Sequence, residues 1–360
     1  MGLPFAPPFC PQSSCRYHRC PAGWPYKRIG FYTRHCPPRR IQRYLCLHCR
    51  RSFSTQTFST TYWLRRPELL KPLFYRLLTC GGFRQLTREL KAAPSTLVHL
   101  AARLGRHCLL FQRLHQPPVD EPLALDGFES FEWSQYFPCH FHVLVGCRSH
   151  FFYGFTDSPL RRKGRMTPRQ RVRREQLELQ LGRPDPGSIR HEVAALLRLC
   201  GLSRGTVDLH TDDHPAYPRA FRELPDLTVH HHVTSSLERR TTSNPLFPVN
   251  LLDLLIRHNS ANHKRETIAF SKRRQGAIER LALLQVWRNF IKPFSEQHGG
   301  GTPAQRLGLF DQSLTLKEIL RRRLFPSRID LPEGWVRYYR RQVITPALGR
   351  HRVHTLRYGF

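Results

Sequence analysis

The first 49 residues restrict the fold most, because six of the eleven cysteines of this chain lie within them. Four of these cysteines form two short pairs, Cys10-x4-Cys15 and Cys46-x2-Cys49, which are separated by 30 residues. Zinc prefers four soft ligands in a tetrahedron, and each pair can present two thiolates from a tight turn. A segment this short buries little apolar surface, so a bound metal would hold it together. We therefore expect a structural Zn²⁺ site built from Cys10, Cys15, Cys46 and Cys49.

Other residues in this segment leave the fourth zinc ligand open. Cys20 and Cys36 are rival thiolates, and His18, His35 and His48 are rival imidazoles. A tract in which cysteines cluster by chance is the alternative, and the short-range pairing argues against it. A disulfide framework would need an oxidising secretory route. The proline-rich first residues lack the features of a signal peptide, so we expect a cytoplasmic protein.

The charge of the chain indicates the class of its partner. There are 58 Lys and Arg against 26 Asp and Glu, which gives a formal net charge of +32. Such an excess attracts polyanions, either nucleic acid or an anionic membrane surface. The sequence contains no run of 18 or more apolar residues, so we expect no spanning helix and no membrane partner. Nucleic acid is therefore the expected partner.

Composition divides the chain into four expected parts. They are a zinc ribbon at residues 1–60, a helix-turn-helix domain at 61–115, an α/β catalytic domain at 120–295 and a basic C-terminal tail at 296–360. In the second part, residues 83–90 and 96–104 carry leucines at helical spacing, and Ser95 between them is a good N-cap. This pattern predicts that Thr96, His99 and Arg103 face a DNA major groove. An ordinary helical hairpin is the alternative.

Strand-like segments dominate from residue 123 onward. The expected strands are residues 123–131, 141–146, 151–155, 206–210 and 227–233, and the expected helices are residues 189–200, 218–224 and 250–256. Three strands, a helix, a strand, a helix, a strand and then helices is the order of an RNase H-like mixed sheet. We expect the basic insertion at residues 161–187 to be mobile. The predicted fold class is therefore multidomain α/β.

Two aspartates next to these strands are candidate metal ligands. Asp126 lies inside an apolar strand, and Asp212 follows the fourth strand. The first and fourth strands are neighbours in an RNase H-like order, so these carboxylates would converge. Mg²⁺ and Mn²⁺ prefer oxygen ligands, and two such ions can activate a water or a 3′-hydroxyl at a phosphodiester. For either aspartate alone, an ordinary surface position is the alternative.

Four motifs occur in order along the chain: Cys46-Leu-His-Cys49-Arg-Arg-Ser-Phe-Ser54, Leu125-Asp126-Gly127, Thr211-Asp212-Asp213-His-Pro-Ala-Tyr217 and Arg265-Glu-Thr-Ile-Ala-Phe-Ser-Lys272. Together they resemble DDE-type insertion-sequence transposases that begin with a zinc ribbon. The resemblance implies a retroviral-integrase-like catalytic domain that cuts and joins double-stranded DNA at element ends and at a target. It also implies a bacterial, nucleoid-associated protein of a family that commonly acts as homo-oligomers. By the same resemblance, Asp126 and Asp212 are the first two metal ligands.

The third metal ligand departs from the family pattern, which commonly places Glu-Arg-x-Asn ahead of the last motif. Without gaps, Asn250 occupies the position of that Glu and Asp253 the position of that Asn. Asp253 lies about one helical turn from Asn250 and can therefore face the same site. An ion pair with Arg257 at i+4 is the ordinary alternative for Asp253. Glu238 and Glu266 are further candidates for the third acid.

Basic residues outside the helical part are expected to contact DNA phosphates, with Arg265 and Lys272 as the leading candidates. His230 and His232 can share one face of a strand, where we expect them near phosphate rather than on a metal. The sequence therefore predicts a DNA transposase with Mg²⁺-dependent cleavage and strand transfer. A catalytically decayed, transposase-derived DNA-binding protein and an RNA-binding component of a ribonucleoprotein are the alternatives.

Overall fold

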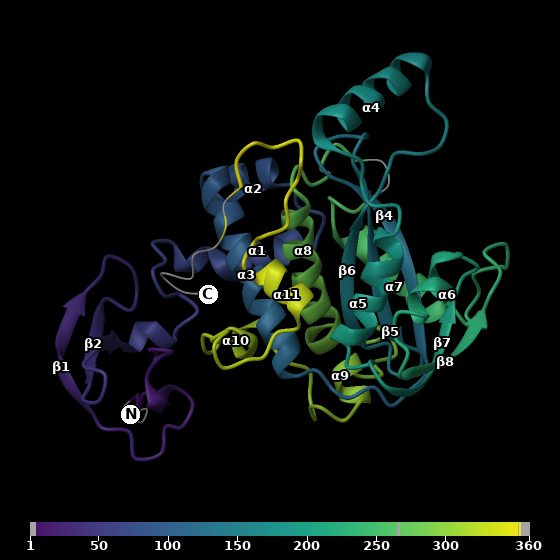
Figure 1. Cartoon of the computed structure of the whole chain (residues 1–360). Helices are drawn as coiled ribbons and strands as arrows, with labels where there is room; N and C mark the ends of the chain where they lie inside the picture. The colour runs from purple at the N-terminus through teal and green to yellow at the C-terminus, as the bar shows by residue number, and fades with distance from the viewer. Residues whose placement is uncertain (1–4, 265–266, 352, 354–360) are drawn as a thin grey trace.

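The computed structural model describes residues 5–264, 267–351 and 353. It is mixed α/β with two sheets, and the smaller one forms an N-terminal module at one side of the larger body (Figure 1). This sheet is antiparallel and contains β1 (Tyr26–Thr33), β2 (Arg40–Cys46) and β3 (Ser52–Ser54). Aromatic rings fill its core, where Phe53 stacks at 5.3 Å on Trp24 and at 5.4 Å on Tyr44. Stacked aromatics bury much surface per residue, which suits so small a module.

Three helices follow the module: α1 (Leu70–Leu77), α2 (Phe83–Leu90) and α3 (Pro94–Leu114). The leucines expected to hold α2 and α3 together are buried, with Leu86 on α2 and Leu97, Leu100 and Leu104 on α3. The expected N-cap is wrong, because α3 begins at Pro94 with Ala93 as its N-cap. Proline suits the first helical position, where the missing N–H would have had no helical partner.

The larger sheet has five strands in the order β6-β5-β4-β7-β8. They are β4 (Leu123–Phe131), β5 (Pro138–Gly146), β6 (Phe152–Pro159), β7 (Gly205–Thr211) and β8 (Leu227–Val233). The first three strands are antiparallel to one another, whereas β7 runs parallel to β4 and β8 parallel to β7. The expected adjacency of the first and fourth strands of this sheet is therefore confirmed.

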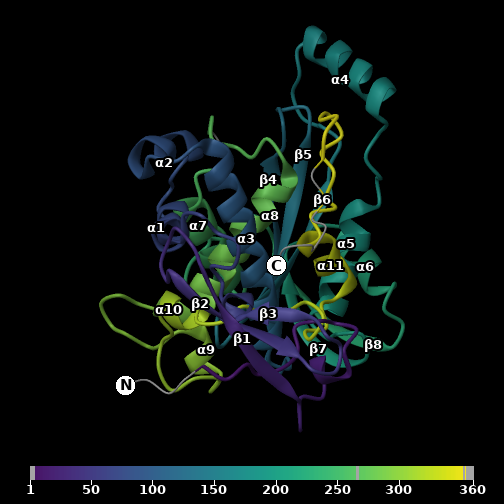
Figure 2. The same ribbon diagram turned by 90° about the vertical axis from the view of Figure 1, so that its left-hand side faces the viewer.

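Helices cover both faces of this sheet (Figure 2). α5 (Ser188–Leu199) packs on β5 and β6, and Gly154 of β6 lies so close that an added Cβ would meet the Leu199 side chain at 2.8 Å. α7 (Phe247–Asn259) packs on β4 and β5. On that face, the rings of Phe128 and Phe141 lie 5.3 and 5.2 Å from His263, just after α7. A short helix, α6 (Ala216–Phe221), connects β7 and β8.

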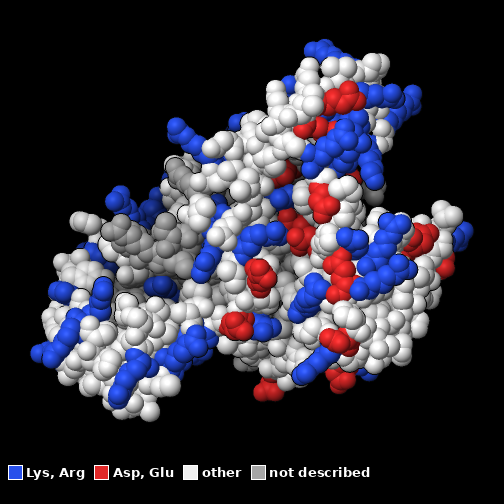
Figure 3. Space-filling view, viewed as in Figure 1, with Lys and Arg blue, Asp and Glu red and all other residues white. Residues whose placement is uncertain are grey.

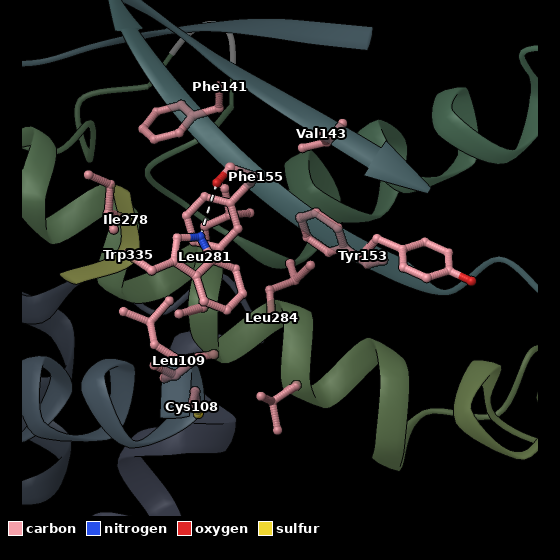
Figure 4. Packing of buried hydrophobic residues seen from close by; sticks show 14 of the residues in the cluster. Cys108, Leu109, Phe141, Val143, Tyr153, Phe155, Ile278, Leu281, Leu284 and Trp335 are labelled. Atoms are coloured by element: carbon pink, nitrogen blue, oxygen red, sulfur yellow. Dashed lines mark hydrogen bonds between the residues drawn. The ribbon is translucent and has the colours of Figure 1, made fainter. Parts of the chain in front are cut away.

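The outer edge of β6 is covered by α8 (Arg274–Val286) and the π-helical turn that follows it. Gln285 donates to the carbonyls of Phe152 and Tyr153, and Asn289 both donates to and accepts from the backbone of Phe152. These side chains satisfy edge groups that would otherwise be left unpaired in the core. Figure 4 shows Leu281 and Leu284 of α8 packed among the sheet's aromatic residues.

The C-terminal part, expected as a basic tail, contributes to the core of the larger body. It contains α9 (Pro303–Arg306), α10 (Leu316–Ile319) and α11 (Glu333–Tyr339). Trp335 is 1% exposed and donates from its indole to the Phe155 carbonyl at 3.3 Å (Figure 4). Tyr338 donates to Asp157, whose carboxylate also pairs with Arg274 at 2.7 Å. The basic residues of this part therefore belong to a folded segment.

The insertion at residues 161–187 carries a helix, α4 (Pro168–Leu181), that projects from the body (Figure 1). A reciprocal pair of hydrogen bonds between Thr167 and Gln170 begins it, as in a capping box. Within the described residues, no helix is long and apolar enough to span a membrane. The expected boundaries of the four domains stay a prediction.

Candidate carboxylate site and metal centre

The two cysteine pairs meet in the N-terminal module. The sulfurs of Cys10, Cys15, Cys46 and Cys49 all lie within 4.8 Å of one another. Cys10 and Cys15 flank the turn that leads into the first short helix, while Cys46 ends β2 and Cys49 lies in the turn before β3. Four thiol groups at this spacing can bind zinc as a closed structural site. This is the ligand set expected from the sequence.

Hydrogen bonds to Cys46 favour its thiolate, which is the form that binds metal. The Trp24 indole donates to the Cys46 sulfur at 3.2 Å, and the Cys49 backbone amide donates to it at 3.5 Å. Burial acts to raise the pKa of Cys46, but the hydrogen bonds outweigh this effect, and the net result is a lowered pKa of about 7. Burial raises the pKa of Cys10 and Cys15, so these two thiols would release their protons when zinc binds, and the donor set of four cysteines fits Zn²⁺.

The rival ligands lie elsewhere or have other partners. His18 is buried, with its ring nitrogens bonded to the Cys10 carbonyl at 2.7 Å and the Ser327 hydroxyl at 2.8 Å. Cys36 accepts from Arg34 at 2.6 Å and donates to a backbone carbonyl. Cys20 is exposed. His48 does approach the group, at 3.5 Å from the Cys15 sulfur, where it can orient that ligand.

Asp126 and Asp212 come from adjacent strands on one face of the larger sheet. Leu123 pairs with Leu209 and Ala124 with His210, so two further steps in this parallel register set Asp126 beside Asp212. Each carboxylate accepts a backbone hydrogen bond. Asp126 accepts from the Gly127 amide at 2.6 Å, and Asp212 accepts from the His214 amide at 3.1 Å. These bonds hold Asp126 within β4 and Asp212 just after the end of β7.

Asp253 reaches the same place from α7, which covers this face of the sheet. Burial raises the pKa of its carboxyl group well above the ordinary value, and the nearby charge of Asp126 raises it further. One carboxyl oxygen, Oδ1, is buried and has no hydrogen-bond partner among the described residues. Arg257 and Arg240 lower the pKa of both Asp253 and Asp126. A buried carboxyl without a partner is costly unless it serves a ligand.

Neighbouring carboxylates add to the rise that burial causes in the pKa of Asp126 and of Asp253. Burial raises the pKa of Asp126 to about 6, and the charge of Asp212 adds to that rise. Tyr217 of α6 is buried, and this burial, followed by the charges of Asp126, Asp212 and Asp253, raises the pKa of its hydroxyl well above the ordinary value. Like charges gathered in a partly buried site disfavour full ionisation until a cation joins them.

The carboxylates are less tightly clustered than the cysteines. The described residues include a group of at least three potential metal ligands whose ligand atoms all lie within 4.8 Å of one another. The four cysteines form this group. The carboxylate oxygens of Asp126, Asp212 and Asp253 do not all lie within 4.8 Å of one another. The alternative third acid Glu238 is exposed, and Glu266 lies outside the described residues.

The expected DNA-contacting side chains differ in where they lie. His99 is exposed and Thr96 half-buried near the start of α3. Arg103 does not face outward as expected. It is 5% exposed and donates to the backbone carbonyls of Thr60 and Tyr62, because the segment after β3 folds back over α3. Lys272 is exposed, with its ammonium group 3.4 Å from the centre of the Phe270 ring, and Arg265 lies outside the described residues.

His140 and His142 of β5 pack under Gly127, on the face of the sheet opposite Asp126, and did not stand out in the sequence. A Cβ at Gly127 would lie 3.0 Å from a nitrogen of His142 and 3.2 Å from a nitrogen of His140, both on β5. Burial lowers the pKa of His140 to about 4, and the charge of His214 contributes. Alternating histidines on a strand were the available signal. His230 and His232 share a face as expected, and both contact the exposed Asp208, at 3.4 and 3.2 Å.

Comparisons with known proteins give little beyond this geometry. No protein-family model matches the chain, and no curated protein matches its sequence. One solved structure with a similar arrangement is the cryo-EM structure of the simian T-cell lymphotropic virus intasome in complex with PP2A regulatory subunit B56 gamma. The match has 14% sequence identity and a TM-score of 0.24, and it covers 65% of this chain and 71% of that chain. A similarity this low supports no conclusion about the function of the site.

Proposed function

We propose that this chain is a DNA transposase whose RNase H-like domain holds Mg²⁺ or Mn²⁺ between Asp126, Asp212 and Asp253. The observation that carries the proposal is the parallel pairing of β4 with β7 in the sheet that α7 covers, which supports a meeting of carboxylates from these three elements beside the buried Tyr217. Natural proteins rarely gather acids in this way without a cation or a catalytic role. The formal net charge of +32 adds the attraction for a polyanionic substrate.

The chain's own residues would supply position and charge. Backbone bonds from Gly127 and His214 fix Asp126 and Asp212 while leaving oxygens of both carboxylates available. Asp253 has to lose its proton to become a ligand, and Arg257 and Arg240 favour that loss. When bound, the cations would activate the attacking water or 3′-hydroxyl and stabilise the leaving oxygen.

DNA binding would fall to the remaining parts. In this proposal the N-terminal module is a zinc ribbon, and α2 and α3 form a helix-turn-helix that presents His99 and Thr96 to element ends. Lys272 fits the same surface, because the charge of Arg84 on α2 is among the causes that lower its pKa, after burial. We expect assembly of more than one copy on the two element ends.

The decisive experiment is Mg²⁺-dependent nicking of a supercoiled plasmid that carries the inverted repeats flanking the gene. Asp126→Asn should reduce nicking by about a hundredfold or more, because it removes a metal ligand, while end binding stays unchanged. Asp208→Asn is the matched control, since Asp208 is an exposed aspartate on the neighbouring strand β7 and should nick normally. Retained nicking by Asp126→Asn would reject the catalytic assignment.

A catalytically decayed DNA-binding protein is the second candidate. It is favoured by the spacing of the three carboxylates, which do not all lie within 4.8 Å of one another. Wild-type protein that binds the ends tightly yet leaves the plasmid intact in both Mg²⁺ and Mn²⁺ would support this candidate over the transposase.

A further inference from the structure

A large cleft lies between the N-terminal module and the C-terminal segment that packs against it. Its volume is about 1410 Å³, and its walls come from β1, β3, residues 62–65 and residues 323–340. Sites for small molecules usually measure roughly 300–1,000 Å³. The cleft is therefore large enough for several units of a polymer, and it is built from residues other than the three aspartates.

Positive charge dominates this cleft. The arginines in its walls are Arg34, Arg43, Arg51, Arg65, Arg323 and Arg340, against one acidic wall residue, Asp330. Residues 1–67 contain twelve Lys and Arg and no Asp or Glu. Figure 3 shows basic side chains spread over the exposed face of the N-terminal module. Such a surface attracts polyanions and repels basic partners.

Aromatic side chains lie among these arginines. Trp63 is 65% exposed and Tyr32 38% exposed, and both line the cleft together with Tyr62. Trp63 also has a φ of +59°, which is uncommon for a bulky residue and marks strain that the surrounding structure must impose. Exposed rings between cationic groups are the pattern of proteins that bind single strands, because unpaired bases stack on them.

The segment that carries Tyr62 and Trp63 is held in place by contacts with α3 and with the C-terminal segment. Arg103 of α3 donates to the Tyr62 and Thr60 carbonyls. The guanidinium of Arg323 lies 5.1 Å from the centre of the Tyr62 ring and 4.5 Å from that of the Phe325 ring, while its backbone amide donates to Phe58 at 2.8 Å. The Tyr62 ring and the backbone next to Trp63 are thus held before any ligand arrives, which lowers the entropy lost on binding.

We propose that this cleft binds an unpaired DNA strand, with bases stacked on Trp63 and Tyr32 and phosphates neutralised by Arg43, Arg51 and Arg65. A duplex cannot use the rings in this way, because its base faces are already stacked within the helix. The site goes beyond the carboxylate chemistry, since strand binding here needs no divalent cation and no strand cleavage.

The test measures binding of the full-length, zinc-loaded chain to a fluorescent oligothymidylate without added divalent metal. Trp63→Ala should weaken binding by about tenfold, the loss of one stacked base, and Trp63→Phe should restore most of it. Trp133→Ala is the matched control, because Trp133 is 43% exposed, has the same φ of +59° and does not line the cleft. Arg51→Ala should reduce the slope of log K against log salt by about 0.7, whereas Arg204→Ala, outside the cleft, should not.

Three outcomes would overturn the proposal. They are unchanged binding by Trp63→Ala, an equal loss on a duplex of mixed sequence, and tighter binding of an RNA strand than of its DNA counterpart. Zinc content and melting temperature of each variant show that the fold is intact. Because nicking is not measured, a failure of the cleft proposal and a failure of the catalytic proposal give separate results.

Discussion

At the scale of single residues, the role of Asp253 distinguishes the proposed transposase from the catalytically decayed DNA-binding protein. Burial and the charge of Asp126 raise the pKa of its carboxyl group, which makes it the candidate for the third acid. Asp253→Asn should reduce Mg²⁺-dependent nicking by about a hundredfold, whereas Glu238→Gln, on an exposed side chain, should nick as wild type does. Loss of nicking in Glu238→Gln alone would transfer the role to that residue.

A buried histidine should make the fold sensitive to acid. His107 of α3 is 1% exposed and bonds to the Ile319 carbonyl at 2.9 Å. Burial lowers its pKa to about 4, below the unfolded value of about 6.5. Its stabilising contribution is therefore complete above pH 6.5 and is lost as pH falls toward 4, by about 2 kcal/mol at pH 5.

Urea unfolding at pH 7.5 and at pH 5 measures this contribution. The wild type should lose about 2 kcal/mol more stability between these pH values than His107→Gln does, because the variant cannot take up that proton in the unfolded state. His258→Gln removes an exposed histidine and should keep the wild-type pH dependence. Equal pH dependence in all three proteins would contradict the assignment.

At the scale of elements, α3 and α8 approach each other at a glycine. A Cβ at Gly105 would lie 2.8 Å from the Glu279 backbone, so Gly105→Ala must push the helices apart and should cost about 1–3 kcal/mol. Gly276 of α8 has nothing within 4 Å of the same position, so Gly276→Ala should stabilise the chain by up to about 1 kcal/mol. Chemical denaturation of both variants gives the comparison, and equal effects would rule out a close contact at Gly105.

Elements with a strong local pattern were predicted well from the sequence. β4 and β8 have the predicted bounds, because alternation of apolar and polar residues needs no knowledge of the rest of the chain. The features that sequence reasoning missed depend on distant partners. α3 begins at Pro94 with Ala93 as its N-cap, where Ser95 was predicted. Arg103 points into the protein and donates to the backbone carbonyls of residues 60 and 62.

At the scale of the whole molecule, the candidate site also combines features that a local sequence pattern predicts with features that depend on distant partners. The predicted adjacency of β4 and β7 follows from the strand order, and it brings Asp126 and Asp212 together. The packing of His140 and His142 under Gly127 depends on the register of β4 with β5, which the alternation of histidines along β5 does not give by itself. The cleft was also missed, since it forms only where the C-terminal segment packs against the N-terminal module.

The zinc centre should link these two distant parts of the chain. The aromatic core beside the four cysteines includes Phe325, and Arg328 donates to the His18 carbonyl. Removal of zinc by a chelator, or Cys46→Ser, should therefore increase hydrogen exchange in residues 5–60 and also in residues 320–328. The larger body has its own core and should keep its exchange protection. Cys20→Ser, on an exposed cysteine outside the centre, should retain its zinc and its protection, and loss of zinc in that variant instead of Cys46→Ser would show that the ligand set is different.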